Sequence, residues 1–116
     1  MVATKNNDVI LGVLAVPWEP KLKELLIWIE NKWSNNTITC AYEKRDYSSV
    51  HSTIPLRGFD LRSRNFIDPQ KIADEINSQW IYDPQRPEKK CCVFHDVGKG
   101  PHFHLQVHND TFCIPF

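Results

Sequence analysis

Histidine and aspartate side chains with the spacing of a metal site are the most chemically informative feature of this sequence. His102 and His104 lie two positions apart in the alternating segment HFHLQVH, and His51 and Asp60 lie upstream. Residues two apart on a strand face the same side, with Cα atoms about 6.6 Å apart, so both imidazoles can line one site. Two imidazoles and one carboxylate suit zinc, and three protein ligands leave one coordination position to water, as in catalytic sites.

An H-x-H pair alone is weak evidence, because a histidine on a strand is more often exposed or hydrogen-bonded than a ligand. The segment SSVHSTIPLRGFDLRSR adds His51 and Asp60, and Gly58 permits the backbone to turn tightly beside the aspartate. A metal held by such residues lowers the pKa of a water ligand to about 7 and polarises a carbonyl group. The pattern therefore favours metal-assisted hydrolysis near neutral pH.

These motifs resemble those of the D-alanyl-D-alanine carboxypeptidases and L-alanyl-D-glutamate endopeptidases of bacteria and phages, which are related in fold to the lysostaphin peptidases and the hedgehog signalling domain. The family pattern is S-x-H, a short spacer, small-x-D, and a later strand bearing the third ligand, often as H-x-H. Residues 49–51, 58–60 and 102–104 match these three motifs in turn. The resemblance covers residues 37–108, and the spacer before the aspartate is longer here than in the usual pattern.

The resemblance implies that His51, Asp60 and His104 hold one Zn²⁺ ion. It also implies zinc-dependent hydrolysis of peptide bonds in bacterial cell-wall peptidoglycan, by a carboxypeptidase or an endopeptidase similar to phage endolysins. The expected partner is a peptidoglycan peptide. Small size and the lack of a recognisable signal peptide suit a phage enzyme that is made in the cytoplasm and then released to the cell wall or carried in a particle.

The general base departs from the family pattern. The carboxypeptidase branch has an acidic residue three positions before the last ligand, where this chain has Pro101. His102 is therefore the first candidate to orient or deprotonate the attacking water, and His95 or Asp96 is the second. The missing acidic residue also supports an alternative, a catalytically inactive zinc-binding module of the same fold.

Basic residues near these motifs are further candidates for the site. The family carries a cation just after the strand that precedes S-x-H, where Arg45 or Lys44 would stabilise charge on the substrate carbonyl. Either residue is as readily explained as a solvated cation. Other arginines near the aspartate can bind a substrate carboxylate through forked hydrogen bonds or form a solvated basic rim: Arg57, Arg62 and Arg64.

A third alternative comes from another class of enzyme, the single-strand DNA nicking enzymes, in which an H-x-H strand binds a divalent metal beside a tyrosine. No tyrosine follows His104 in this chain. Fourteen basic and fourteen acidic side chains give a net charge of zero, which disfavours binding to nucleic acid. We therefore expect neither a nucleic-acid partner nor insertion into a membrane, and the sequence leaves the oligomeric state open.

The elements that must position these residues are predicted from hydrophobic periodicity and from turn residues. In chain order the sequence predicts a strand at 9–16, a helix at 20–33, a strand at 37–42, a long irregular excursion at 43–65, a helix from 69 to about 80, and strands at 91–94 and 102–108. A chain of 116 residues fits one domain, 1–116. We expect an α+β fold, a small mainly antiparallel sheet with two helices packed on one face.

Side chains without an expected chemical role are assigned to the core and to capping. Phe103, Leu105 and Val107 alternate with histidines and should point inward. The tryptophans at 28, 33 and 80 are expected in the core, and Asp68 is expected to cap the second helix. His108 is expected to be exposed. The four cysteines lack C-x-x-C spacing and are expected to be buried, reduced thiols.

Overall fold

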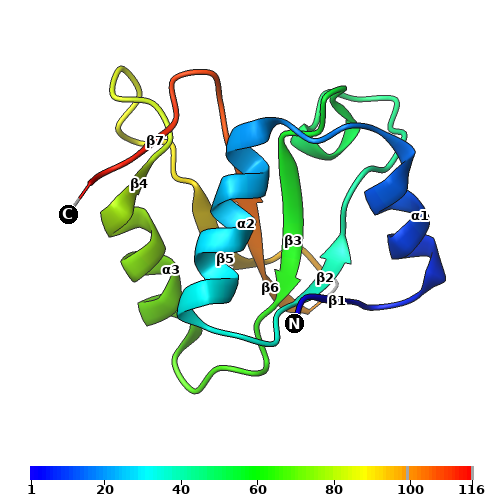
Figure 1. Cartoon of the computed structure of the whole chain (residues 1–116), viewed down its shortest axis with the longest axis horizontal. Helices are drawn as coiled ribbons and strands as arrows, with labels where there is room; N and C mark the ends of the chain where they lie inside the picture. The colour runs from blue at the N-terminus through cyan, green and yellow to red at the C-terminus, as the bar shows by residue number, and fades with distance from the viewer. Residues whose placement is uncertain (99, 116) are drawn as a thin grey trace.

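The computed structural model describes residues 1–98 and 100–115. Three helices and a mostly antiparallel sheet make an α+β fold, as the sequence predicts (Figure 1). The elements in chain order are β1 (Ala3–Thr4), α1 (Asn7–Ala15), α2 (Pro20–Lys32), β2 (Thr37–Cys40), the 3-10 helix η1 (Val50–Ser52), β3 (Gly58–Arg62), α3 (Pro69–Gln79), β4 (Trp80–Ile81), β5 (Cys92–Asp96), β6 (Pro101–Gln106) and β7 (Phe112–Cys113).

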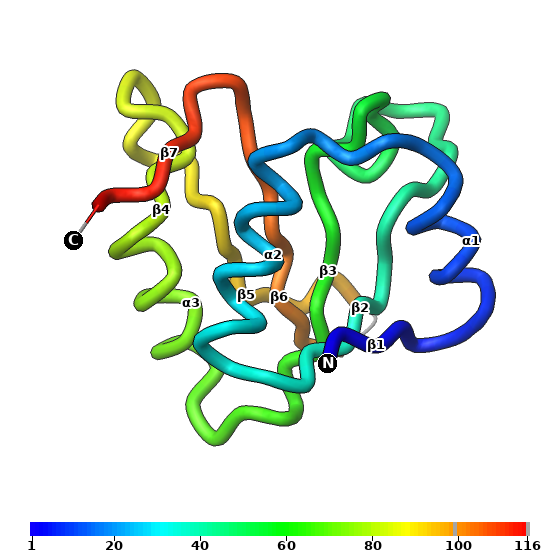
Figure 2. Tube along the Cα trace, in the orientation of Figure 1, coloured from blue at the N-terminus to red at the C-terminus, as the bar shows by residue number. Residues whose placement is uncertain are grey.

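The main sheet has five strands in the order β1-β2-β3-β6-β5, so β3 and β6 lie at its centre. Only the two-residue β1 is parallel to its neighbour, and the other pairs are antiparallel. The tube in Figure 2 shows β3 and β6 side by side, with α2 in front of β5 and β6 and with α1 beside β2. A separate pair of short strands, β4 and β7, lies near the C-terminus.

The core lies between the sheet and helices α2 and α3. Strand β6 alternates as predicted, because Phe103 and Leu105 are almost fully buried and the histidines beside them are half-buried. Leu25 of α2 and Ile76 of α3 belong to the same buried cluster. Because successive side chains of a strand point to opposite faces, the polar side chains of β6 lie on the face away from the core.

Helices α2 and α3 agree with the sequence prediction to within a few residues. Each has proline in its first turn, where the missing N–H costs no helical hydrogen bond. The side chain of Asp68 accepts a hydrogen bond from Lys71 N and caps α3, as predicted. Trp80 is buried, whereas Trp28 and Trp33 are only half-buried and pack edge to face, with ring centroids 6.0 Å apart.

The predicted strand at 9–16 is wrong, because these residues form helix α1. The side chain of Asn6 accepts a hydrogen bond from Val9 N and begins the helix. Val9 and Gly12, three residues apart, face inward on consecutive turns. A short run of consecutive apolar residues fits a buried strand or a helix equally well, so periodicity alone could not separate them.

The predicted irregular excursion at 43–65 is also wrong over its second half, because it contains the central strand β3. Phe59 and Leu61 are buried, whereas Asp60 and Arg62 are only partly buried and face the other side. The alternation of Phe59 and Leu61 with polar residues is too short to indicate a strand among so many basic residues. The irregular segment therefore ends before Gly58, and strand β3 places Asp60 in the middle of the sheet.

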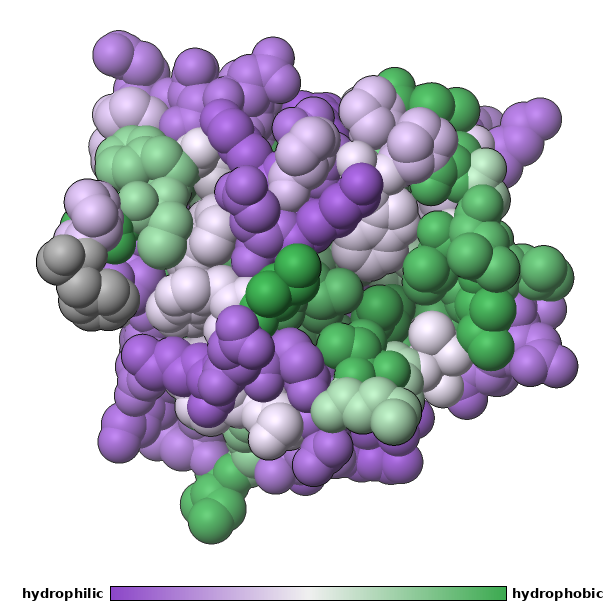
Figure 3. Space-filling view, viewed as in Figure 1, coloured by the Kyte–Doolittle hydropathy of each residue, from purple (hydrophilic) through white to green (hydrophobic). Residues whose placement is uncertain are grey.

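Apolar side chains remain exposed on α1. Figure 3 shows hydrophobic residues gathered over this helix, and Ile10, Leu11 and Leu14 are 40%, 65% and 75% exposed. Among the residues that the structure describes, no helix has the length and apolar character needed to cross a membrane.

Gly58 is needed for close packing rather than for a tight turn. A Cβ atom at this position would lie 2.3 Å from Val50 Cγ2 and 3.2 Å from Leu105 O. We expect Gly58→Ala to destabilise the fold by roughly 1–3 kcal/mol through overpacking, measured as a lower urea midpoint. Adding Val50→Ala should recover part of the loss, and an unchanged midpoint in the single variant would refute this packing role.

Candidate metal centre

Strand register brings the predicted ligands together on the face of the sheet opposite the core. Asp60 on β3 pairs directly with His104 on β6, and Arg62 pairs with His102. Side chains of directly paired residues lie about 4.5–5.5 Å apart at Cβ. Two residues of the H-x-H motif therefore line the same face as the aspartate.

His51 reaches this face from the 3-10 helix η1. The hydroxyl of Ser49 accepts a hydrogen bond from His51 N, 3.2 Å away, and caps the turn. The His51 carbonyl also accepts a hydrogen bond of 2.8 Å from Glu43 N. These contacts bury His51 to 4% exposure and explain physically why the serine of the S-x-H motif precedes the histidine by two positions.

The three predicted ligands meet at one carboxylate oxygen. Asp60 Oδ1 lies 3.2 Å from His51 Nε2 and 3.1 Å from His104 Nδ1. Ligand atoms held at roughly 2.0–2.1 Å from a tetrahedral zinc are separated by about 3.3 Å. Both separations from Asp60 Oδ1 are close to that spacing, so each histidine lies at a distance from the carboxylate that a shared metal ion would require.

The tautomer of His51 is fixed by a backbone carbonyl. His51 Nδ1 lies 3.1 Å from Ala41 O, which can only accept a hydrogen bond. A neutral His51 therefore carries its proton on Nδ1 and presents the lone pair of Nε2 to Asp60. Orientation by a carbonyl is typical of metal-binding histidines.

His104 is oriented in the same way by Gln106. His104 Nε2 lies 3.1 Å from Gln106 Oε1, and the amide of Gln106 is held by donating to Lys90 O at 2.8 Å. The amide oxygen therefore faces the ring, and a neutral His104 presents the Nδ1 lone pair to Asp60. Two lone pairs and a carboxylate that face one another need a positive charge between them, which a metal ion or protons can supply.

The ionisation of Asp60 fits this environment. Burial by itself raises the pKa of the carboxyl, but His104 and His51 lower it by more when their rings carry a proton toward Asp60, through hydrogen bonds and positive charge, so the pKa lies well below the usual range. Asp60 is therefore a carboxylate at neutral pH. An ionised carboxylate is the form that binds a metal.

His102 and His95 form a second imidazole pair beside the ligands. His102 Nδ1 lies 3.1 Å from Gly100 O, so a neutral ring carries its proton there. Its Nε2 lies 3.2 Å from His95 Nε2 and 3.6 Å from Asp60 Oδ2. Burial and the charges of His102 and His104 lower the pKa of His95, which favours its neutral form. Both candidate bases are therefore within reach of the site.

Asp96, the other candidate base, is used differently. Its Oδ1 accepts hydrogen bonds from Gly98 N and Gly100 N and stabilises the turn between β5 and β6. Its side chain does not line the cavity described below, as far as the described residues show. The structure thus brings His95 and His102, but not Asp96, to the predicted ligands.

The site opens into a cavity of about 920 Å³. Residues at its wall include all five candidate side chains of the centre and a set of cations: Lys5, Arg45, Arg62 and Arg64. Arg57 and Lys44 are not part of this wall. The cavity wall therefore combines the imidazoles with two carboxylates, Asp60 and Glu43, and with four cations.

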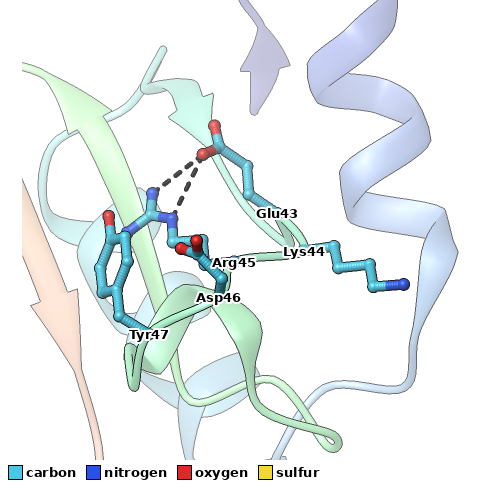
Figure 4. Close-up of a pocket in the computed structure, with 5 residues that line it drawn as sticks. All are labelled: Glu43, Lys44, Arg45, Asp46 and Tyr47. Carbon is cyan, nitrogen blue, oxygen red and sulfur yellow. Dashed lines mark hydrogen bonds and ion pairs between the residues drawn. The ribbon is translucent and has the colours of Figure 1, made fainter.

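Arg45 rather than Lys44 faces the site. Figure 4 shows the Arg45 guanidinium directed at the Glu43 carboxylate, while Lys44 extends away from both. Arg45 Nη2 lies 3.0 Å from Glu43 Oε1, and Nη1 donates to Ser49 Oγ at 2.9 Å. The arginine is therefore tied to the same serine that caps the turn of His51.

Cys40 is a site residue that the sequence prediction missed. Its sulfur, a His51 nitrogen and an Asp60 oxygen lie within 4.8 Å of one another and form a group that can hold a metal. Cys40 is one of two half-buried thiols, with Cys113, whereas Cys91 and Cys92 are buried as predicted. No local motif marked Cys40, because its position depends on strand pairing.

A second group that can hold a metal consists of Asp83, His108 and Asp110. Asp83 Oδ2 already accepts a hydrogen bond of 2.8 Å from Arg86 Nε, so its charge is partly neutralised. His108 is not exposed as predicted, because its ring packs on Tyr82 with centroids 5.8 Å apart. The group lies outside the wall of the cavity.

Comparisons of the chain with protein-family profiles, with curated proteins and with solved structures find no match. The candidate function therefore rests on the chemistry of the site and on the sequence motifs.

Gln106 provides a test of the metal centre that leaves every ligand in place. Gln106→Met keeps the length of the side chain but removes the acceptor that holds His104. We expect metal affinity to fall roughly 10- to 100-fold, as is usual when a partner of a metal-binding histidine is lost. Competition with a chromogenic chelator measures this change. Gln85→Met, at an exposed position, is the matched control, and equal affinity in both variants would contradict the role of Gln106.

Proposed function

We propose that this protein is a zinc-dependent peptidase with a hedgehog-type fold that hydrolyses peptide bonds in bacterial cell-wall peptidoglycan. The observation that carries the proposal is the meeting of His51 Nε2 and His104 Nδ1 at Asp60 Oδ1, with both rings oriented by acceptors behind them. His51, Asp60 and His104 would hold the zinc ion. When bound, zinc acts as a Lewis acid that activates water near neutral pH and polarises a carbonyl oxygen.

His102 is the general base in this proposal. The Gly100 carbonyl holds the proton on Nδ1, which leaves Nε2 to accept a proton from the attacking water. As the water oxygen bonds to the carbonyl carbon, His102 takes the proton and returns it to the amine when the C–N bond breaks. His95 Nε2 lies 3.2 Å from this same His102 nitrogen and holds the ring by donating to it, so that hydrogen bond gives way when the attacking water binds.

Cations on the cavity wall supply the remaining electrostatic function. Arg45 stabilises the negative charge that develops on the carbonyl oxygen. Arg62 and Arg64 on the same wall bind a carboxylate of the substrate. The cations favour an anionic peptide, and the assignment to peptidoglycan rests on the sequence resemblance.

A zinc-binding module without catalytic activity is the second candidate. Pro101 stands where the carboxypeptidase branch has its acidic base, and Arg45 is paired with Glu43 and Ser49. This candidate keeps the metal ligands but predicts no hydrolysis.

Digestion of purified peptidoglycan by the zinc-loaded protein separates the two candidates. The peptidase should release free amino groups, lose this activity with a chelator and regain it with zinc. A protein that holds stoichiometric zinc but releases no amino groups would support the inactive module. A protein that binds no zinc at micromolar concentrations would refute both.

A further inference from the structure

A shift in strand register places Cys40 on the face of the metal centre. Ile38 pairs with Leu61, but Cys40 pairs with Asp60, so the register of β2 and β3 shifts between these two pairs. An unbroken antiparallel register would set Cys40 opposite Phe59, whose side chain lies in the core. A bulge that redirects one side chain is a common feature beside functional sites.

The shift completes a row of three ligand-type side chains across neighbouring strands. Cys40, Asp60 and His104 are directly paired in succession on β2, β3 and β6. The sulfur, a His51 nitrogen and an Asp60 oxygen lie within 4.8 Å of one another, and the His51 nitrogen at 3.6 Å from the sulfur is Nδ1, which is not the proposed ligand atom. A sulfur and a nitrogen or oxygen bound to one tetrahedral zinc are separated by about 3.6 Å. The half-buried thiol must therefore rotate toward Asp60 and His51 Nε2 when a metal binds.

One carboxylate and one guanidinium flank the sulfur. Glu43 Oε2 accepts a hydrogen bond from Cys40 Sγ at 3.4 Å, and Arg45 Nη2 lies 3.9 Å from the sulfur. Cys40 therefore carries its proton in the free protein and donates it to Glu43.

We infer that Cys40 is a fourth protein ligand of the same metal ion. On binding, the thiol proton leaves to solvent, the sulfur bonds to the metal, and Arg45 remains as the nearby positive charge. A Cys-His-Asp-His set fills the position that a three-residue site leaves to water. This inference rests on the proposed zinc site and deepens it: zinc can expand to five ligands in the transition state, so a site with four protein ligands can still take the attacking water.

Cobalt substitution tests this inference without relying on activity. Co²⁺ bound to a thiolate gives an intense sulfur-to-metal absorption in the near ultraviolet, whereas Co²⁺ held by nitrogen and oxygen alone does not. We expect this absorption in the protein titrated with one equivalent of Co²⁺. It should disappear in Cys40→Ser while the visible cobalt bands remain, and it should persist in Cys113→Ser, the matched control at the other half-buried thiol.

The outcomes separate the inference from the proposed function. Visible cobalt bands without the near-ultraviolet absorption in the unmodified protein would overturn the role of Cys40 and leave the three-residue site intact. No bound cobalt in the unmodified protein would overturn both. If Cys40→Ser fails to fold, alkylation gives a second test: bound Co²⁺ should protect Cys40, but not Cys113, from iodoacetamide, and equal labelling with and without cobalt would overturn the inference.

Discussion

Replacement of Asp60 by asparagine is expected to reduce zinc affinity more than the roughly 10- to 100-fold loss that follows removal of a supporting residue. Asp60 supplies the negative charge of the predicted ligand set, and its Oδ1 is the atom shared by His51 and His104. Asparagine keeps the size of the side chain but offers a weaker, neutral ligand. Calorimetric titration with zinc measures the change, and hydrolysis should be lost with the metal.

The matched control for this variant is Asp74→Asn, at an exposed position on α3 far along the chain from the motifs. Zinc affinity should be unchanged in this control. If Asp60→Asn bound zinc as tightly as the unmodified protein, the ion would have to be held elsewhere, and the group at Asp83, His108 and Asp110 would be the next candidate.

Replacement of His102 by glutamine is expected to reduce hydrolysis roughly 10²- to 10⁴-fold while the bound zinc stays at one equivalent. The proposed base contacts Asp60 and His95 but is not one of the three predicted ligands. A variant that keeps its full metal content but loses activity has lost a general base, whereas a variant that loses the metal as well has lost a ligand. Metal analysis and the release of amino groups from peptidoglycan provide the two measurements.

Two further variants decide the assignment of the base. His108→Gln, whose ring packs on Tyr82 away from the cavity, should keep full activity. His95→Gln should lose less activity than His102→Gln, because His95 acts through its neighbour. A larger loss in His95→Gln would transfer the role of the base to His95.

The parts of the site that lie on strongly patterned strands could be predicted from the sequence. The alternation of Phe103 and Leu105 with histidines set the direction of each side chain on β6, since one face had to be buried. Proline and aspartate marked the start of α3 in the same direct way. The motifs around His51 and Asp60 indicate which polar residues form one site, but they do not indicate which atoms are in contact.

The remaining features depend on interactions that no local pattern encodes. Helix α1 cannot be predicted from periodicity, because a short run of consecutive apolar residues fits a strand as well as a helix, and only its cap at Asn6 favours the helix. Strand β3 was missed because its two buried residues lie among arginines. Cys40 reaches the centre only through a shift in register between two strands, which a single sequence does not show.

Anomalous diffraction at the zinc edge, from crystals of the zinc-loaded protein, tests the central claim most directly. We predict one strong peak within coordinating distance of His51 Nε2, Asp60 Oδ1 and His104 Nδ1, the three atoms that already meet in the structure. A peak only at Asp83, His108 and Asp110, or no peak with zinc in excess, would contradict the account.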